Sequence, residues 1–217
     1  METKGMFKRP AGEEFSAALD PNRRQVMQRA LEAALDGSAA DHPSVALVGW
    51  QAATLVEFAY ECASRVVIVE DDERLVDSIE KGLLARDLGK KVKLVTESPN
   101  QVSLDEHVDV AVTAVNSTWF VEGDEAAVLA NIRKNVLKKK GLLVPRRLAH
   151  LFEVVASATA VAGMPLRVPR YCRPGEPVAV LSESKHFLTT ELGGTDEIAA
   201  EIDDTIIVKP LLSGRIS

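Results

Sequence analysis

Hydrophobic residues follow two different periods along the chain as far as Val144. Short apolar runs predict strands at 45–48, 65–69, 91–96, 108–113 and 141–144. Amphipathic segments between or before them predict helices at 21–36, 52–64, 72–87 and 124–137. Continuous apolar strands that alternate with helices are typical of a mostly parallel sheet covered on both faces.

The pattern changes after Pro145, where prolines and glycines separate shorter apolar runs. Segments 151–156 and 178–181 predict strands, and 206–208 is a candidate for another. We therefore expect an α/β fold in which residues 1–145 form a Rossmann-like, doubly wound domain with an N-terminal helix. Residues 146–217 are expected to form antiparallel strands that complete the sheet, together with a small β appendage.

Composition narrows the class of protein. Of the 217 residues, 46% are hydrophobic and 27% are charged, and no apolar run approaches the roughly 18 residues that a membrane helix needs. The first fifteen residues have no apolar core of the kind found in secretion signals, so we expect a cytoplasmic protein. A net charge of −6 disfavours a nucleic-acid partner. Two distant cysteines and four scattered histidines predict no metal site.

The turn after the first strand contains Gly49, and the second strand ends at Glu70. In a doubly wound sheet both positions face the ligand pocket beyond the carboxyl ends of the strands. An acidic residue at Glu70 commonly accepts hydrogen bonds from the hydroxyls of an adenosine ribose. The alternative is that the acidic run Glu70, Asp71 and Asp72 caps the following helix.

The side chains of the turn bear on which adenosine cofactor would fit. A pyrophosphate needs a close approach of backbone amides, which Gln51 and Ala53 would crowd, so a dinucleotide is disfavoured. S-adenosylmethionine carries no phosphate. Its requirements are a partner for the ribose, a partner for the carboxylate and room for the sulfonium, and a turn with fewer glycines can meet them.

Four stretches between about residues 18 and 150 resemble a known family. They are ALDPNRRQVMQRAL, VALVGWQAATL, SRVVIVEDD, and VDVAVTAVNSTWF through LKKKGLLVPRRLAHLFEVV. The first is similar to a helix with an Asp-x-x-Arg element, and the last ends in a Gly-x-x-x-Pro-x-Arg strand. Together they resemble the class I S-adenosylmethionine-dependent methyltransferases, and most of all the core of the protein arginine methyltransferases.

This resemblance implies a role for each matched residue. Arg23 would pair with the methionine carboxylate, and Glu97 or Ser98 would lie near the adenine. The cofactor-binding candidates are Arg23, Gly49, Trp50, Gln51, Glu70, Asp71, Glu97 and Ser98. Each has an ordinary alternative, because Arg23 is typical of a helix surface, Trp50 of a packed core, and Glu97 and Ser98 of a loop.

The sequence departs from the family's glycine motif. Leu47, Gln51 and Ala53 stand where the family has an acidic residue and two further glycines. Replacing a glycine at positive φ costs on the order of 1 kcal/mol, and each such loss in binding lowers affinity about fivefold. Either the turn has a different shape here, or its cofactor affinity is lower than the family's.

The loop that would bind the methyl acceptor also departs from the family's pattern. Arginine methyltransferases hold the guanidinium between two glutamates, whereas Ala114 occupies the first position here and Glu122 lies near the second. We therefore predict an acceptor other than arginine. Asn116 can orient an attacking nitrogen or serve in a turn. Glu122 is a candidate base, with Asp124 and His150 as nearby alternatives.

The sequence thus predicts an S-adenosylmethionine-dependent methyltransferase that acts on a small-molecule or protein substrate, with a homodimer as a candidate assembly. One alternative is a non-catalytic binding or scaffold protein with the same fold. An NAD(P)-binding oxidoreductase is a further alternative, which the missing glycines disfavour.

Overall fold

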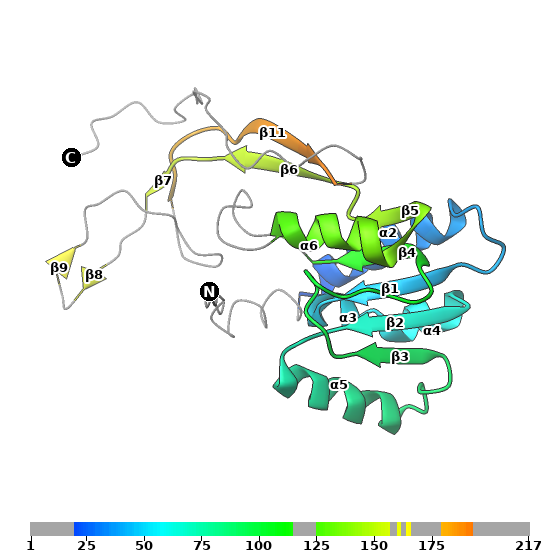
Figure 1. Ribbon diagram of the computed structural model, residues 1–217. Coiled ribbons are helices and arrows are strands. Elements are labelled where there is room, and N and C mark those ends of the chain that lie inside the picture. Colours follow the sequence, from blue (N-terminus) through cyan, green and yellow to red (C-terminus); the bar gives the residue numbers. More distant parts are fainter. Residues whose placement is uncertain (1–19, 115–124, 157–159, 162–163, 166–178, 193–217) are drawn as a thin grey trace, which may run out of the picture. The chain divides into compact units, whose positions relative to one another are not determined.

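The computed structural model describes residues 20–114, 125–156, 160–161, 164–165 and 179–192. Their centre is a five-stranded sheet in the order β3-β2-β1-β4-β5 (Figure 1). Its strands are β1 (Ser44–Val48), β2 (Arg65–Val69), β3 (Val92–Val95), β4 (Val108–Thr113) and β5 (Leu137–Val144). Every neighbouring pair in this sheet is parallel, as the sequence predicted.

Alternate residues of the central strands pack into two separate cores. Val45 and Leu47 of β1 face a cluster that includes Leu31 and Ala59 from the helices on one side. Ala46, between them, faces a second cluster on the other side of the sheet. All five residues of β1 are buried, because a parallel sheet covered on both faces has no solvated side.

The helices cover these two faces. The helical segments are α2 (Pro21–Asp36), α3 (Trp50–Ala53), α4 (Val56–Cys62), α5 (Glu73–Ala85), α6 (Glu125–Asn131) and the π-helical η2 (Ile132–Val136). Helix α2 begins where the sequence predicted, since Asp20 caps it by accepting hydrogen bonds from the amides of Asn22 and Arg23. The first core is covered by α2 to α5 and the second by α6 and η2.

One predicted helix is broken. The single helix expected at 52–64 is two helices, α3 and α4, separated at Thr54 and Leu55. The Thr54 hydroxyl donates to the Gln51 carbonyl oxygen at 2.7 Å, and the Leu55 amide bonds three residues back to Ala52. These two bonds span three residues and end α3 after one turn. Gln51 lies within that single turn.

The described residues form two compact units. Those up to Leu148, with Glu191 and Leu192, form the first, and Ala149 to Thr190 form the second. The shorter strands form three two-stranded sheets, which pair β6 (Arg147–Phe152) with β11 (Lys185–Glu191), β7 (Val155–Ala156) with β10 (Ala179–Val180), and β8 (Ala160–Val161) with β9 (Met164–Pro165). The C-terminal antiparallel β-extension is confirmed, although none of its described strands joins the central sheet as expected, and strands β8, β9 and β11 were not predicted. The candidate strand 206–208 lies outside the described residues.

Candidate functional site

The turn between β1 and α3 is built on a glycine in the left-handed region. Gly49 has φ 83° and ψ 152°, and its amide donates to the carbonyl oxygen of Val69 at 2.9 Å, which joins the turn to the end of β2. A Cβ atom added to Gly49 would meet no atom within 4 Å. The backbone therefore requires glycine here for its conformation, and the space above the turn is open.

Glu70 lies at the carboxyl end of the neighbouring strand and is only 6% exposed. Its Oε2 accepts the Trp50 amide at 2.7 Å, and its Oε1 accepts the amides of Asp71 and Asp72, each at 3.0 Å. Burial raises the pKa of the Glu70 carboxyl, although the hydrogen bonds from these three amides act to lower it. Glu70 thus holds the Gly49 turn and the start of the β2–α5 loop together.

The two aspartates after Glu70 have different places. Asp72 caps α5, since its Oδ1 accepts the Arg74 amide at 3.0 Å, as the capping alternative predicted for this acidic run. Hydrogen bonds from the Arg74 side chain are the main reason that the pKa of Asp72 falls to about 2. The side chain of Asp71 is exposed.

Two of the predicted cofactor-binding residues, Arg23 and Gln51, line one small cavity. Its lining residues are Arg23, Arg24, Met27, Gln51, Thr54, Leu55 and Ala114, from α2, the α3–α4 segment and the end of β4. The volume of this cavity is about 20 Å³. The Oε1 atom of Gln51 is buried and has no hydrogen-bond partner among the described residues.

The structure gives less information about three other predicted cofactor-binding residues, Trp50, Glu97 and Ser98. Trp50 is half-buried at the start of α3. Glu97 is exposed and Ser98 is half-buried in the loop after β3, where the Ser98 carbonyl oxygen accepts the amides of Gln101 and Val102 in a turn.

The predicted catalytic residues Asn116 and Glu122 lie outside the described residues, as does Asp124. His150 belongs to the second unit, where its Nε2 lies 3.1 Å from the Thr190 hydroxyl. Burial, and then the neighbouring His186, lowers the pKa of His150.

Sequence reasoning missed two residues, one in the lining of the cavity and one buried in α6. Thr54 lines the cavity and also ends α3, and a threonine inside a predicted helix was the available signal. Glu125 is 6% exposed in the first turn of α6, the helix that follows β4 along the chain. An acidic residue in a first helical turn is so common that its burial could not be foreseen.

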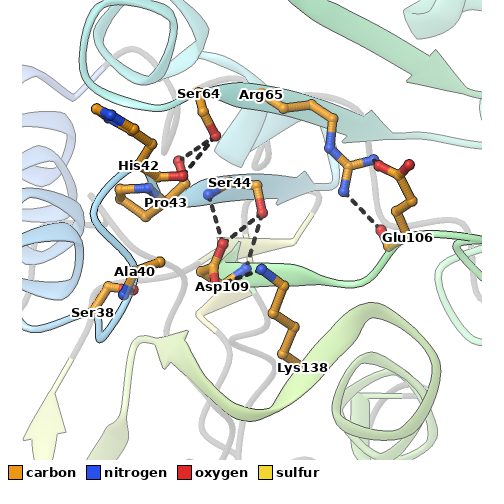
Figure 2. A network of polar contacts seen from close by, with 10 residues as sticks. All are labelled: Ser38, Ala40, His42, Pro43, Ser44, Ser64, Arg65, Glu106, Asp109 and Lys138. Atoms are coloured by element: carbon orange, nitrogen blue, oxygen red, sulfur yellow. Dashed lines mark hydrogen bonds and ion pairs between the residues drawn. The ribbon is translucent and has the colours of Figure 1, made fainter.

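A larger cavity, of about 410 Å³, lies at the opposite edge of the sheet, where the strands begin. Its lining residues include Ser44, Arg65, Glu106, Asp109 and Lys138 (Figure 2). The charged groups here pair with one another, since Arg65 bonds Glu106 at 3.1 Å and Lys138 bonds Asp109 at 2.8 Å. The carboxyl edge is the better candidate, because ligands of doubly wound sheets bind beyond the carboxyl ends of the strands.

Within the described ranges, no cluster of three or more His, Cys, Asp or Glu side chains could hold a metal ion. Nor does any helix in those ranges have the length and hydrophobicity needed to span a membrane.

No protein-family model matches the sequence, and no curated protein matches it either. Solved structures do match in fold. The PRMT1 enzyme–prozyme heterotetrameric complex with AdoHcy from Trypanosoma brucei superposes with a TM-score of 0.63 at 12% identity, covering 86% of this chain. Protein arginine methyltransferase 10 of Arabidopsis thaliana, in an open conformation, superposes with a TM-score of 0.61 at 14% identity, covering 82%. The matched region spans 62% of each of those chains.

These likenesses confirm the fold expected from the sequence. The chain has the α/β fold of these methyltransferase structures, with a central five-stranded parallel sheet.

Proposed function

We propose that the protein binds S-adenosylmethionine at the carboxyl edge of β1 and β2 and transfers its methyl group to an acceptor other than arginine. One observation carries the proposal: the buried Glu70 carboxylate is bonded to the Gly49–Trp50 turn where the sheet order changes direction, between β1 and β4. Ligands of open α/β sheets bind at this switch point.

The residues present fit an adenosyl ligand in three respects. Each carboxylate oxygen has about two acceptor sites, and Glu70 Oε2 accepts the Trp50 amide, so it retains capacity for a ribose hydroxyl. The open space above Gly49 leaves the backbone accessible at the point where a ligand would cross β1. Arg23, in the cavity beside Gln51, would pair with the methionine carboxylate.

The short α3 disfavours a dinucleotide. A pyrophosphate is stabilised by the dipole and free amides of a well-formed helix that starts at the glycine turn. Helix α3 has four residues, and the Trp50 amide at its start is already bonded to Glu70. The cofactor proposed is therefore one without phosphate.

The cofactor would supply an electrophilic methyl group on a sulfonium, and the protein would supply positioning. In the transfer the sulfur–methyl bond breaks, a bond to the acceptor atom forms, and the acceptor loses a proton. Ala114, half-buried at the end of β4, cannot provide the first carboxylate of a guanidinium clamp. We therefore propose a small-molecule or protein acceptor of another kind, with Asn116 and Glu122 as candidates for orienting it.

The likeness to solved structures supports this proposal through the fold, and one of those structures contains AdoHcy. Its heterotetrameric assembly is also compatible with our proposal that this chain forms a homodimer.

A scaffold protein without catalysis is the second candidate. The small cavity favours it, because about 20 Å³ has room for roughly one water molecule and not for a methionine moiety unless side chains turn aside. In that case Glu70 would serve only to hold the turn.

Isothermal titration calorimetry with S-adenosylmethionine, S-adenosylhomocysteine and NADH separates these functions. The proposal expects micromolar binding of the two adenosyl ligands and none of NADH. Binding of NADH alone would indicate an oxidoreductase, and no binding of any ligand would support the scaffold. Incubation with methyl-labelled S-adenosylmethionine and candidate acceptors then distinguishes catalysis from binding.

A further inference from the structure

The buried amide oxygen of Gln51 needs an explanation. Buried polar atoms are nearly always hydrogen-bonded, since burial without a partner costs free energy. Gln51 Oε1 is buried, lacks a partner among the described residues, and belongs to a side chain that lines the cavity beside α2. The atom is an acceptor only, so a group that satisfies it must donate a hydrogen bond.

The surroundings of Gln51 restrict the charge of that group. Two cationic residues, Arg23 and Arg24, line the same cavity, together with the apolar residues Met27 and Leu55. Guanidinium groups favour a carboxylate, and an amide oxygen favours an N–H donor. A ligand end that carries both an anion and a donor matches the set, and an α-amino-acid head group is such an end.

The cavity can admit a larger group only if side chains move. Its present volume has room for roughly one water molecule, which is the ordinary way to satisfy a buried oxygen. Arg24 is an exposed part of the lining, and its long side chain can turn toward solvent, whereas Leu55 is buried and Ala114 is small.

We propose that Gln51 makes the site selective for a zwitterionic α-amino-acid head, its Oε1 accepting a hydrogen bond from the ammonium while Arg23 pairs with the carboxylate. This inference rests on the proposed function, in which the head belongs to S-adenosylmethionine. It assigns a specific role to a side chain that stands where the resembling family has glycine. Gln51 is then a specificity-determining residue and not merely an obstruction in the turn.

The test removes each partner of the proposed bond in turn. S-adenosylhomocysteine has the complete head, its deaminated analogue keeps the carboxylate but lacks the ammonium, and 5′-methylthioadenosine lacks both. Calorimetry measures the dissociation constants of all three for the wild type and for Gln51→Leu. We expect the substitution to weaken S-adenosylhomocysteine about tenfold, since a hydrogen bond to a charged group is lost, and to leave the other two unchanged.

The wild type should likewise bind the deaminated analogue about tenfold more weakly than S-adenosylhomocysteine. Gln51→Met, which keeps the length of the side chain, should repeat the result if Gln51→Leu folds poorly. Gln25→Leu is the matched control, because Gln25 is exposed on α2 and does not line the cavity.

The outcomes separate this inference from the proposed function. If the wild type binds none of the three ligands, the proposed function fails. If it binds S-adenosylhomocysteine and its deaminated analogue equally, or if the Gln51 variants weaken 5′-methylthioadenosine as much as S-adenosylhomocysteine, the role of Gln51 is overturned while the adenosyl site stands.

Discussion

At the scale of single residues, the Glu70 carboxylate has two roles. It accepts three backbone amides, which fixes the turn after β1, and in the proposed complex it also accepts a ribose hydroxyl. Burial raises its pKa, so the charged form is held in place against a desolvation cost by those amides. We therefore expect a change at this position to affect both folding and binding.

Glu70→Gln tests that double role. The glutamine amide nitrogen would face a backbone N–H, so at least one buried amide loses its acceptor, and we expect a loss of about 1–3 kcal/mol in the free energy of unfolding. Affinity for S-adenosylhomocysteine should fall about tenfold. Urea denaturation and calorimetry measure the two effects. The control Glu80→Gln makes the same change at an exposed side chain of α5, and an equal effect there would contradict the account.

Gly49→Ala isolates the conformational requirement of the turn. Because a Cβ at Gly49 meets no atom within 4 Å, any loss comes from the positive φ and not from a clash. We expect a decrease of about 1 kcal/mol or more in the free energy of unfolding, measured by urea denaturation. Gly89→Ala is the control, since a Cβ there also meets nothing within 4 Å and its φ is not positive. Equal stability of the two variants would refute the strain argument.

At the scale of elements, a polar network joins the amino ends of three strands. Asp109 of β4 accepts the amide and the hydroxyl of Ser44 in β1, at 2.9 and 2.8 Å, and the ammonium of Lys138 in β5 at 2.8 Å (Figure 2). Burial acts to raise the pKa of Asp109, but the bonds from Lys138 and Ser44 outweigh it, and the pKa is lowered. The network therefore supports the register of β1, β4 and β5.

Asp109→Asn should destabilise the protein in a pH-dependent way. We expect a loss of about 1–2 kcal/mol at pH 7, because the amide nitrogen would face the Lys138 ammonium. A lowered folded-state pKa means that this stabilisation is fully present above the unfolded pKa of about 3.9 and is lost as the pH falls through the folded value. Denaturation curves of the wild type and of Asp109→Asn should therefore differ more at pH 7 than at pH 3.

Lys138→Met is the matched change in the same network. It removes the ion pair but keeps both Ser44 bonds, and the Lys138 side chain is 51% exposed. We expect a loss below about 1 kcal/mol. If the difference in free energy of unfolding between Asp109→Asn and the wild type grew as the pH fell, the lowered pKa assigned to Asp109 would be contradicted.

The sequence predicted the five parallel strands from their short apolar runs, since both faces of the sheet are buried. It placed the start of the fifth strand at residue 141, whereas β5 begins at Leu137 and includes three exposed lysines that have no strand pattern of their own. It did not predict the break at Thr54, since a threonine hydroxyl competes with helix bonding only in a particular context. Strand β11 was missed because Lys185–Glu191 is mostly polar and pairs with the distant β6. Such long-range pairing leaves no local pattern.

At the scale of the whole molecule, the site combines elements that are far apart in sequence. The edge position of Gly49 and Glu70 follows from the ends of two predicted strands, so their proximity could be inferred from sequence. The burial of Gln51 Oε1 could not, because it depends on how α2 and the end of β4 surround a helix of one turn. Asn116 and Glu122, outside the described residues, stay predictions.

Ligand binding should stabilise the first unit as a whole. At a concentration of S-adenosylhomocysteine about 100 times its dissociation constant, linkage gives about 2.7 kcal/mol. For a chain of this size, that corresponds to a rise in Tm of roughly 5–10 °C. Differential scanning calorimetry measures the shift, with NADH at the same concentration as the control. An unchanged Tm with S-adenosylhomocysteine would argue against binding to the folded state.

The central claim is that the carboxyl edge of β1 and β2 holds an adenosyl group, and a crystal structure of the protein with S-adenosylhomocysteine tests it most directly. The account predicts the ribose hydroxyls at the Glu70 carboxylate, the adenosyl group over Gly49 and the amino-acid head beside Arg23 and Gln51. Ligand density at the amino ends of the strands, around Arg65 and Lys138, would contradict it, as would crystals grown at saturating ligand in which Trp50 and Gln51 fill the carboxyl edge.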